Sequence, residues 1–172
     1  MSTTADVARK WFRWNGVYLC VPPKCGGTAL YCAALGIDPS LGRHVFSTAQ
    51  NMTEFYEEPG LPAFMAVRDP IDRFGSLWRD KCRDGDENMP DLHGLSPETL
   101  MDLVEREPQG NAHWMPQRFW WREGVQLIGY RDLMTHLGLP SLTVNVTKRD
   151  ETPLPVERIR RHYHMDFELI GA

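Results

Sequence analysis

The chain has few of the features that suit a membrane, a nucleic acid or a leader segment. No run approaches the roughly 18 apolar residues that cross a bilayer, and the first six residues have no cationic region leading into an apolar one. We therefore expect a cytoplasmic protein with no membrane partner. The formal net charge of -4 leaves no broad basic surface, which argues against nucleic acid as a partner.

Cysteine is also scarce, and its spacing is uninformative for metals. The four cysteines contain no C-x-x-C pair, and three of them fall within residues 20–32. This pattern suits reduced thiols better than zinc ligands or a disulfide framework. Cys25 is either an oxidation-prone thiol in a cationic loop or a small residue chosen for its fit, and we prefer the second explanation.

What is present is the composition of an ordinary folded protein. The hydrophobic fraction is 42%, the charged fraction is 24%, and six tryptophans argue against disorder. A length of 172 residues suits one domain, 1–172. Val7, Trp11 and Trp14 lie at helical spacing and predict a helical extension within residues 1–15.

Residues 17–35 predict a strand, a loop and a helix. An apolar run ends at Val21, two prolines stop it, and a good helix-forming run begins at Ala29. The loop residues of interest are Lys24, Cys25, Gly26, Gly27 and Thr28. Glycines permit unusual backbone angles, Thr28 stands where a helix N-cap belongs, and amides at a helix start attract anions. With the charge of Lys24 added, the sequence predicts a phosphate loop.

The order of residues in this loop separates it from the usual nucleotide-triphosphatase loop. That loop, G-x-x-x-x-G-K-[ST], has its lysine directly before the Ser or Thr. Here Lys24 precedes the glycines. Taken alone, the segment is equally compatible with a tight turn and an exposed lysine, so a second motif is needed.

Residues 63–78 predict a second unit of strand, turn and helix. Residues 64–67 are continuously apolar, as a strand covered on both faces requires, while Asp69 can cap a helix and Pro70 suits its first position. Arg68 then falls at the carboxyl end of the strand, where open α/β sheets bind ligands. Ser76 lies two turns into the helix. The helix also has a predicted apolar stripe, formed by Ile71, Phe74, Leu77, Trp78 and Cys82.

Together the two units resemble sulfotransferases that use 3'-phosphoadenosine-5'-phosphosulfate (PAPS). Residues 23–28 read Pro-Lys-Cys-Gly-Gly-Thr, and residues 68–76 read Arg-Asp-Pro-x-x-Arg-Phe-x-Ser. The resemblance implies that the first segment binds the 5'-phosphosulfate and that Arg68 and Ser76 bind the 3'-phosphate. Weaker likeness at 113–117, 133–145 and 159–169 extends it over roughly residues 17–170.

The resemblance also implies a fold and a reaction. The fold is α/β, a single three-layer domain with a central parallel sheet, of the P-loop nucleoside-triphosphatase-like sulfotransferase type. The reaction is in-line transfer of a sulfuryl group from PAPS to a hydroxyl or amine of a carbohydrate or small molecule, leaving 3'-phosphoadenosine-5'-phosphate (PAP). Because the transferred group carries little charge, no metal is expected.

An acceptor hydroxyl also needs a base, and histidine has a suitable pKa. His44 follows Lys24 by 20 residues, close to where the family places a Glu or His base. His113 is the second catalytic candidate, better suited to supporting the pocket. Lys148 follows a strand predicted at 142–146 and either adds a charge at the 3'-phosphate or belongs to a solvated basic turn.

The remaining pattern predicts further elements and leaves the acceptor open. We expect a strand near 43–48, helices over 51–58, from Ser96 and from Asp132, and a strand at 125–129. Trp114, Trp120 and Trp121 form either a sugar-stacking wall or part of the core. A nucleotide kinase or other phosphotransferase, or a non-catalytic nucleotide-binding module, are the alternative functions, and the oligomeric state stays open.

Overall fold

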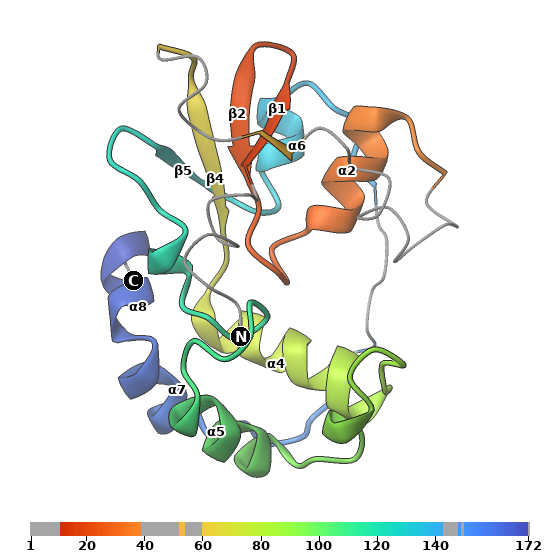
Figure 1. The fold of residues 1–172 in the computed structure, drawn as a ribbon, viewed down its shortest axis with the longest axis vertical. Coiled ribbons are helices and arrows are strands. Elements are labelled where there is room, and N and C mark those ends of the chain that lie inside the picture. Colours follow the sequence, from red (N-terminus) through yellow and green to blue (C-terminus); the bar gives the residue numbers. More distant parts are fainter. Residues whose placement is uncertain (1–10, 39–51, 54–59, 143–147, 149, 172) are drawn as a thin grey trace. The chain divides into compact units, whose positions relative to one another are not determined.

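The structure is a computed structural model that describes all residues except 1–10, 39–51, 54–59, 143–147, 149 and 172. Contacts within the chain divide it into two compact units (Figure 1). The sheet unit contains residues 2–67 and 120–146, and the helical unit contains residues 68–119 and 147–172. The predicted α/β class is confirmed.

The sheet unit is built on a mixed sheet, whose described strands lie in the order β3-β1-β2-β4-β5. Their bounds are Trp11–Trp14 for β1, Val17–Cys20 for β2, Met52–Thr53 for β3, Ala63–Val67 for β4 and Gln126–Gly129 for β5. Strands β2, β4 and β5 are parallel, as predicted for the centre of the sheet. Strand β1 is antiparallel to both β2 and β3.

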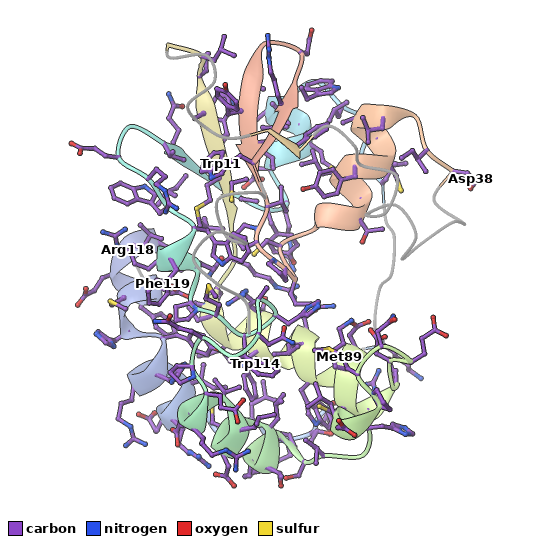
Figure 2. The ribbon with its side chains drawn as sticks, viewed as in Figure 1. Trp11, Asp38, Met89, Trp114, Arg118 and Phe119 are labelled. Atoms are coloured by element: carbon purple, nitrogen blue, oxygen red, sulfur yellow. The ribbon has the colours of Figure 1, made fainter. Side chains whose placement is uncertain are left out.

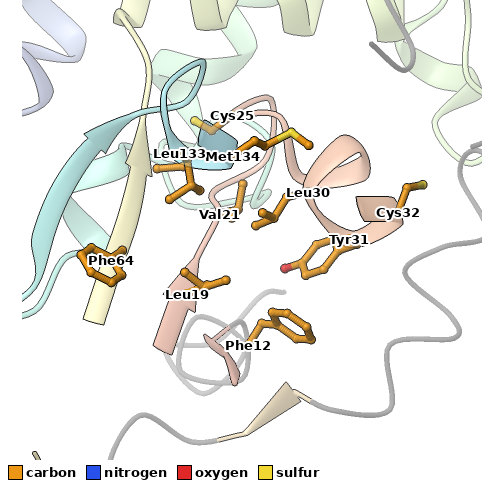
Figure 3. Close-up of a cluster of buried hydrophobic side chains, with 11 residues drawn as sticks. Phe12, Leu19, Val21, Cys25, Leu30, Tyr31, Cys32, Phe64, Leu133 and Met134 are labelled. Atoms are coloured by element: carbon orange, nitrogen blue, oxygen red, sulfur yellow. The ribbon is translucent and has the colours of Figure 1, made fainter. Parts of the chain in front are cut away.

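Two described helices, α2 (Gly27–Leu35) and α6 (Leu133–His136), share one core with the strands. Leu19 and Phe64 from the sheet, Leu30 from α2 and Leu133 from α6 are all buried in it (Figure 3). Full burial of a side chain of this size typically contributes about 1.5–3 kcal/mol. This core therefore fixes the start of α2 against the end of β2.

Residues 11–14 form strand β1, not the end of the predicted helical extension. Asn15 and Gly16 adopt positive φ angles of 48° and 78°, the pair that a tight hairpin turn requires. The Asn-Gly turn pairs β1 with β2, and the Trp14 indole N–H donates to the Ala34 carbonyl at 3.0 Å. Asn-Gly between apolar runs was the signal for this hairpin, and it outweighs the helical spacing of the tryptophans. Residues 1–10 lie outside the described residues.

The helix predicted over 51–58 is wrong at its start. Met52 and Thr53 form β3 and pair with Phe12 and Trp11 of β1. Pairing with the edge of β1 supplies backbone hydrogen bonds that override the local helix signals. Residues 54–59, the strand predicted at 43–48 and all but the first residue of the strand predicted at 142–146 lie outside the described residues.

The helical unit contains short helices around a second core. Its described elements are α4 (Pro70–Trp78), the π-helical turn η2 (Arg79–Arg83), the 3-10 turns η3 (Pro90–Leu92) and η4 (Gln117–Phe119), α5 (Pro97–Arg106), α7 (Val156–His162) and α8 (His164–Ile170). The starts of α4 and α5 are as predicted: Asp69 accepts the Asp72 N–H at 2.9 Å, and Ser96 accepts the Thr99 N–H at 3.1 Å. No helix in the described part of the chain has the length and apolar character to cross a bilayer.

The apolar stripe predicted for α4 lies in the core of the helical unit. Phe74, Leu77, Trp78 and Cys82 are buried there, together with Trp114 and residues of α5 and α7. Tyr163 ends α7 and separates it from α8, and its hydroxyl donates to the Trp114 carbonyl at 2.8 Å. All four cysteines are described and buried, and none of them forms a disulfide; that they are reduced thiols stays a prediction. Burial raises the pKa of the Cys82 thiol to about 11.

Candidate functional site

The loop between β2 and α2 is a tight strand-to-helix turn. The Cys25 N–H donates to the Pro22 carbonyl at 3.1 Å, and Lys24 and Gly26 have φ angles of 69° and 83°. The left-handed region costs a non-glycine residue about 1–2 kcal/mol. Lys24 therefore carries backbone strain, a condition that clusters at functional sites.

Gly26, not Thr28, is the N-cap of α2. Thr28 lies inside the helix, because the loop ends on a residue with positive φ, a conformation that glycine adopts freely and a β-branched residue resists. No side chain of the described residues caps this helix end. The Gly27 and Thr28 amides are among the first N–H groups of the helix, which lack intrahelical partners and lie at its positive end. Gly26 is exposed, and Gly27 and Thr28 are half-buried.

The side chain of Cys25 points into the core of the sheet unit. The residue is 1% exposed and packs in the cluster that contains Val21 and Leu30 (Figure 3). Reactive cysteines need partial exposure. Burial therefore favours the explanation that Cys25 is a small residue chosen for its fit.

Tyr130 is a neighbour of the loop that the sequence did not reveal. It follows β5, its N–H donates to the Val67 carbonyl at 2.9 Å, and its ring lies 3.4 Å from where a Cβ on Gly26 would be. Arg131 donates to the Tyr130 hydroxyl at 3.0 Å. The carboxyl end of β5 thus brings an aromatic ring and a cation to the loop of residues 24–28. The only local signal was the position of Tyr130 and Arg131 directly after a predicted strand.

The second motif is held in the helical unit. Arg68 is half-buried and precedes Asp69, the N-cap of α4, while Ser76 is the seventh residue of that helix and is 8% exposed. Pro70 occupies the first helical position, as predicted. The cap and the proline fix where α4 begins, two residues after Arg68.

The main chain of Arg68 is held by Gln117. The Arg68 N–H donates to Gln117 Oε1 at 2.9 Å, and Gln117 Nε2 donates to the Arg68 carbonyl at 2.8 Å. Gln117 is fully buried, and its own N–H donates to Asp166 of α8 at 2.9 Å. The sequence alone indicated no role for Gln117 or Asp166. Gln117 lies 49 residues after Arg68, and Asp166 lies 49 residues after Gln117.

The two histidine candidates stand differently. His44 lies outside the described residues. His113 is half-buried in the helical unit, where its N–H donates to Asn111 Oδ1 at 2.9 Å and its carbonyl accepts from Arg73 at 3.3 Å. These contacts hold its main chain, and its role as a base or pocket residue stays a prediction.

Lys148 has an exposed side chain and a fixed carbonyl. Arg83 Nη1 donates to that carbonyl at 2.7 Å and to Asp150 Oδ2 at 2.6 Å. Hydrogen bonding by Arg83 holds the pKa of the Asp150 carboxyl below its ordinary value. Arg83 thus anchors the segment that carries Lys148.

The described residues contain no group of three or more His, Cys, Asp or Glu side chains able to hold a metal ion.

Two of the three tryptophans proposed as a sugar-stacking wall are buried. Trp114 and Trp120 are 5% and 0% exposed, which supports core packing for both, while Trp121 is half-buried. Figure 2 shows the Trp114 side chain inside the helical unit.

Comparison with known proteins finds one family model that is similar to part of the chain. Residues 42–121, somewhat less than half of the chain, match the model of the sulfotransferase family. The matched segment contains Arg68, Ser76 and Gln117 and begins after the loop of Lys24. No curated protein and no solved structure matches the chain. The resemblance to sulfotransferases is confirmed over these residues, while the motif of residues 23–28 lies outside the match and the donor stays a prediction.

Proposed function

From the sulfotransferase match over residues 42–121, we propose that this chain transfers a sulfuryl group from PAPS to a hydroxyl or amine of a carbohydrate or small-molecule acceptor. In this proposal residues 1–172 form one three-layer, P-loop-like sulfotransferase domain. The observation that carries it is the segment from Arg68 to Ser76, which lies inside the match and has the capped helix start that its motif requires.

The loop of residues 24–28 suits the 5'-phosphosulfate end of the donor. Uncapped amides at the start of α2, the glycine at position 26 and the charge of Lys24 are the groups that an anion needs. When PAPS is bound, it supplies an activated sulfuryl group whose departure leaves negative charge on a phosphate oxygen. Lys24 and the loop amides stabilise that charge, a role whose removal typically costs about 3–4 kcal/mol.

Arg68 and Ser76 suit the 3'-phosphate. An arginine binds a phosphate with two parallel hydrogen bonds, and a serine hydroxyl adds a third donor. Lys148 is a further candidate cation for this end, with its carbonyl already fixed by Arg83. His44 is proposed to take the proton of the acceptor as it attacks in line with the leaving oxygen, with His113 as the second candidate.

Gly26→Ala should weaken PAP binding more than a control variant that loses the same free energy of unfolding. Ala at φ 83° is strained, and its Cβ would lie 3.4 Å from the Tyr130 ring, on the residue that begins the proposed anion site. Gly124→Ala is the matched control, because Gly124 has φ 80° and no atom within 4 Å of the added Cβ. Both variants should lose about 1–2 kcal/mol of unfolding free energy in denaturant titrations. Equal PAP affinity in the two variants would contradict a role for Gly26 in the anion site.

The proposal is tested directly by following the donor. Purified protein is incubated with PAPS and a panel of sugar and phenolic acceptors, in EDTA, and PAP and the sulfated product are detected by mass spectrometry. We expect PAP to form in step with a sulfated acceptor. Transfer of a phosphoryl group from ATP, seen only when Mg²⁺ replaces EDTA, would select the kinase alternative. PAP binding with no consumption of PAPS on any acceptor would select the non-catalytic module.

A further inference from the structure

The Gln117 side chain acts on Arg68 as a neighbouring strand would. One oxygen accepts the Arg68 N–H at 2.9 Å, and the amide nitrogen donates to the Arg68 carbonyl at 2.8 Å. Arg68 is the first residue after β4, and the last register pair of that strand in the described sheet is Val67 with Gly129. Gln117 supplies a substitute ladder contact, and both main-chain groups of Arg68 are fixed by it.

Asp166 holds Gln117 in turn. Its two carboxylate oxygens accept the N–H groups of Gln117 and Arg118 at 2.9 and 2.8 Å. Asp166 is 0% exposed, and a buried carboxylate is tolerated only when such hydrogen bonds satisfy it. Helix α8 packs against η4 at this point, and Figure 2 labels Arg118 and Phe119 there. The start of η4 is therefore fixed to α8 by a charge-assisted pair of bonds.

We infer that Gln117 and Asp166 are positioning residues that hold Arg68 in the conformation that binds the 3'-phosphate of the donor. The inference rests on the proposed function. Hydrogen bonds of 2.8–2.9 Å link the three residues, and Gln117 and Asp166 are fully buried. Buried, hydrogen-bonded groups keep one geometry. A flexible arginine would lose side-chain and main-chain freedom on binding phosphate, and this arrangement removes the main-chain part of that cost beforehand.

The chemistry of the contact explains why position 117 carries an amide. Arg68 presents one donor and one acceptor, and only a side chain with one acceptor and one donor satisfies both. A carboxylate of the same shape would keep the bond from the Arg68 N–H but place a lone pair against the Arg68 carbonyl. Gln117→Glu therefore disturbs Arg68 with almost no change in volume.

The test compares PAP with ADP, which lacks the 3'-phosphate, by calorimetry. For Gln117→Glu we expect PAP affinity to fall about tenfold or more while ADP affinity changes by less than about twofold, because only PAP uses Arg68. Ser96→Ala is the control: it removes the cap of α5 in the same unit, and it should leave the ratio of the two affinities unchanged. If Gln117 had a purely structural role, Gln117→Glu would lower the affinities for PAP and ADP by the same factor or would change neither.

The outcomes separate this inference from the proposed function, on which it rests. A wild type that binds PAP and ADP equally overturns both. A wild type that prefers PAP, together with a folded Gln117→Glu variant that keeps the full preference, overturns only the positioning role. If Gln117→Glu does not fold, Asp166→Asn replaces it with the same expectation. If neither folds, hydrogen exchange in the wild type decides, since an Arg68 amide that exchanges freely without ligand overturns the inference.

Discussion

Lys24→Ala should lower turnover by about 100- to 1,000-fold while leaving the free energy of unfolding nearly unchanged. The charge of Lys24 matters most when the phosphate oxygen departs, so its loss raises the barrier more than it weakens binding of PAP. Stability should change little, because alanine retains the left-handed strain at φ 69° and the lysine is only half-buried. Steady-state kinetics and denaturant titrations measure the two quantities.

Lys24→Gly is the matched variant for this prediction. Glycine removes the charge and also the strain, so it should be as inactive as Lys24→Ala and yet more stable than it, by roughly 1 kcal/mol or slightly more. The pair separates the charge from the backbone. Wild-type turnover in either variant would remove Lys24 from the mechanism.

His44→Ala should lose about 100- to 10,000-fold in rate and still bind PAP, as expected when a general base is removed. The prediction rests on sequence position and on the resemblance to sulfotransferases, because His44 lies outside the described residues. His44→Glu should restore part of the rate, since a carboxylate can accept the same proton. Single-turnover kinetics with PAPS and the best acceptor measure the loss.

The pH profile gives an independent check on the base. An imidazole base works only when neutral, so wild-type activity should fall as pH drops through the ordinary histidine pKa of about 6.5. The Glu variant should keep its activity to lower pH, because the pKa of a carboxyl group is lower than that of an imidazole and the carboxylate therefore stays deprotonated in more acidic solution. Full activity in His44→Ala, with no activity in His113→Ala, would transfer the role to His113.

Features encoded by neighbouring residues could be predicted from the sequence. The N-cap Asp69 with Pro70 placed the start of α4, and Ser96 with Pro97 placed the start of α5, because each cap bonds to an amide three residues away. The apolar run of β4 and the stripe of α4 were also predicted. The hairpin of β1 and β2 is also encoded locally, by Asn15-Gly16, although the helical spacing of the tryptophans predicts a helix there.

Features that depend on distant residues could not be predicted. Met52 and Thr53 form a strand only because the edge of β1 is available to them. Gln117 and Asp166 acquire their roles from partners 49 residues away, and no local pattern indicates either contact. Gly26 replaces Thr28 as the cap because the loop requires a positive φ there, which depends on the geometry of the whole turn.

The affinity of PAP relative to ADP, measured by calorimetry on the wild-type protein, tests the central claim most directly. The claim is that Arg68 and Ser76 recognise a 3'-phosphate. It predicts that PAP binds more tightly by about 1.5–3 kcal/mol, or about 10- to 150-fold, the value of a charge-assisted hydrogen-bonded pair. Equal affinity for PAP and ADP would contradict it.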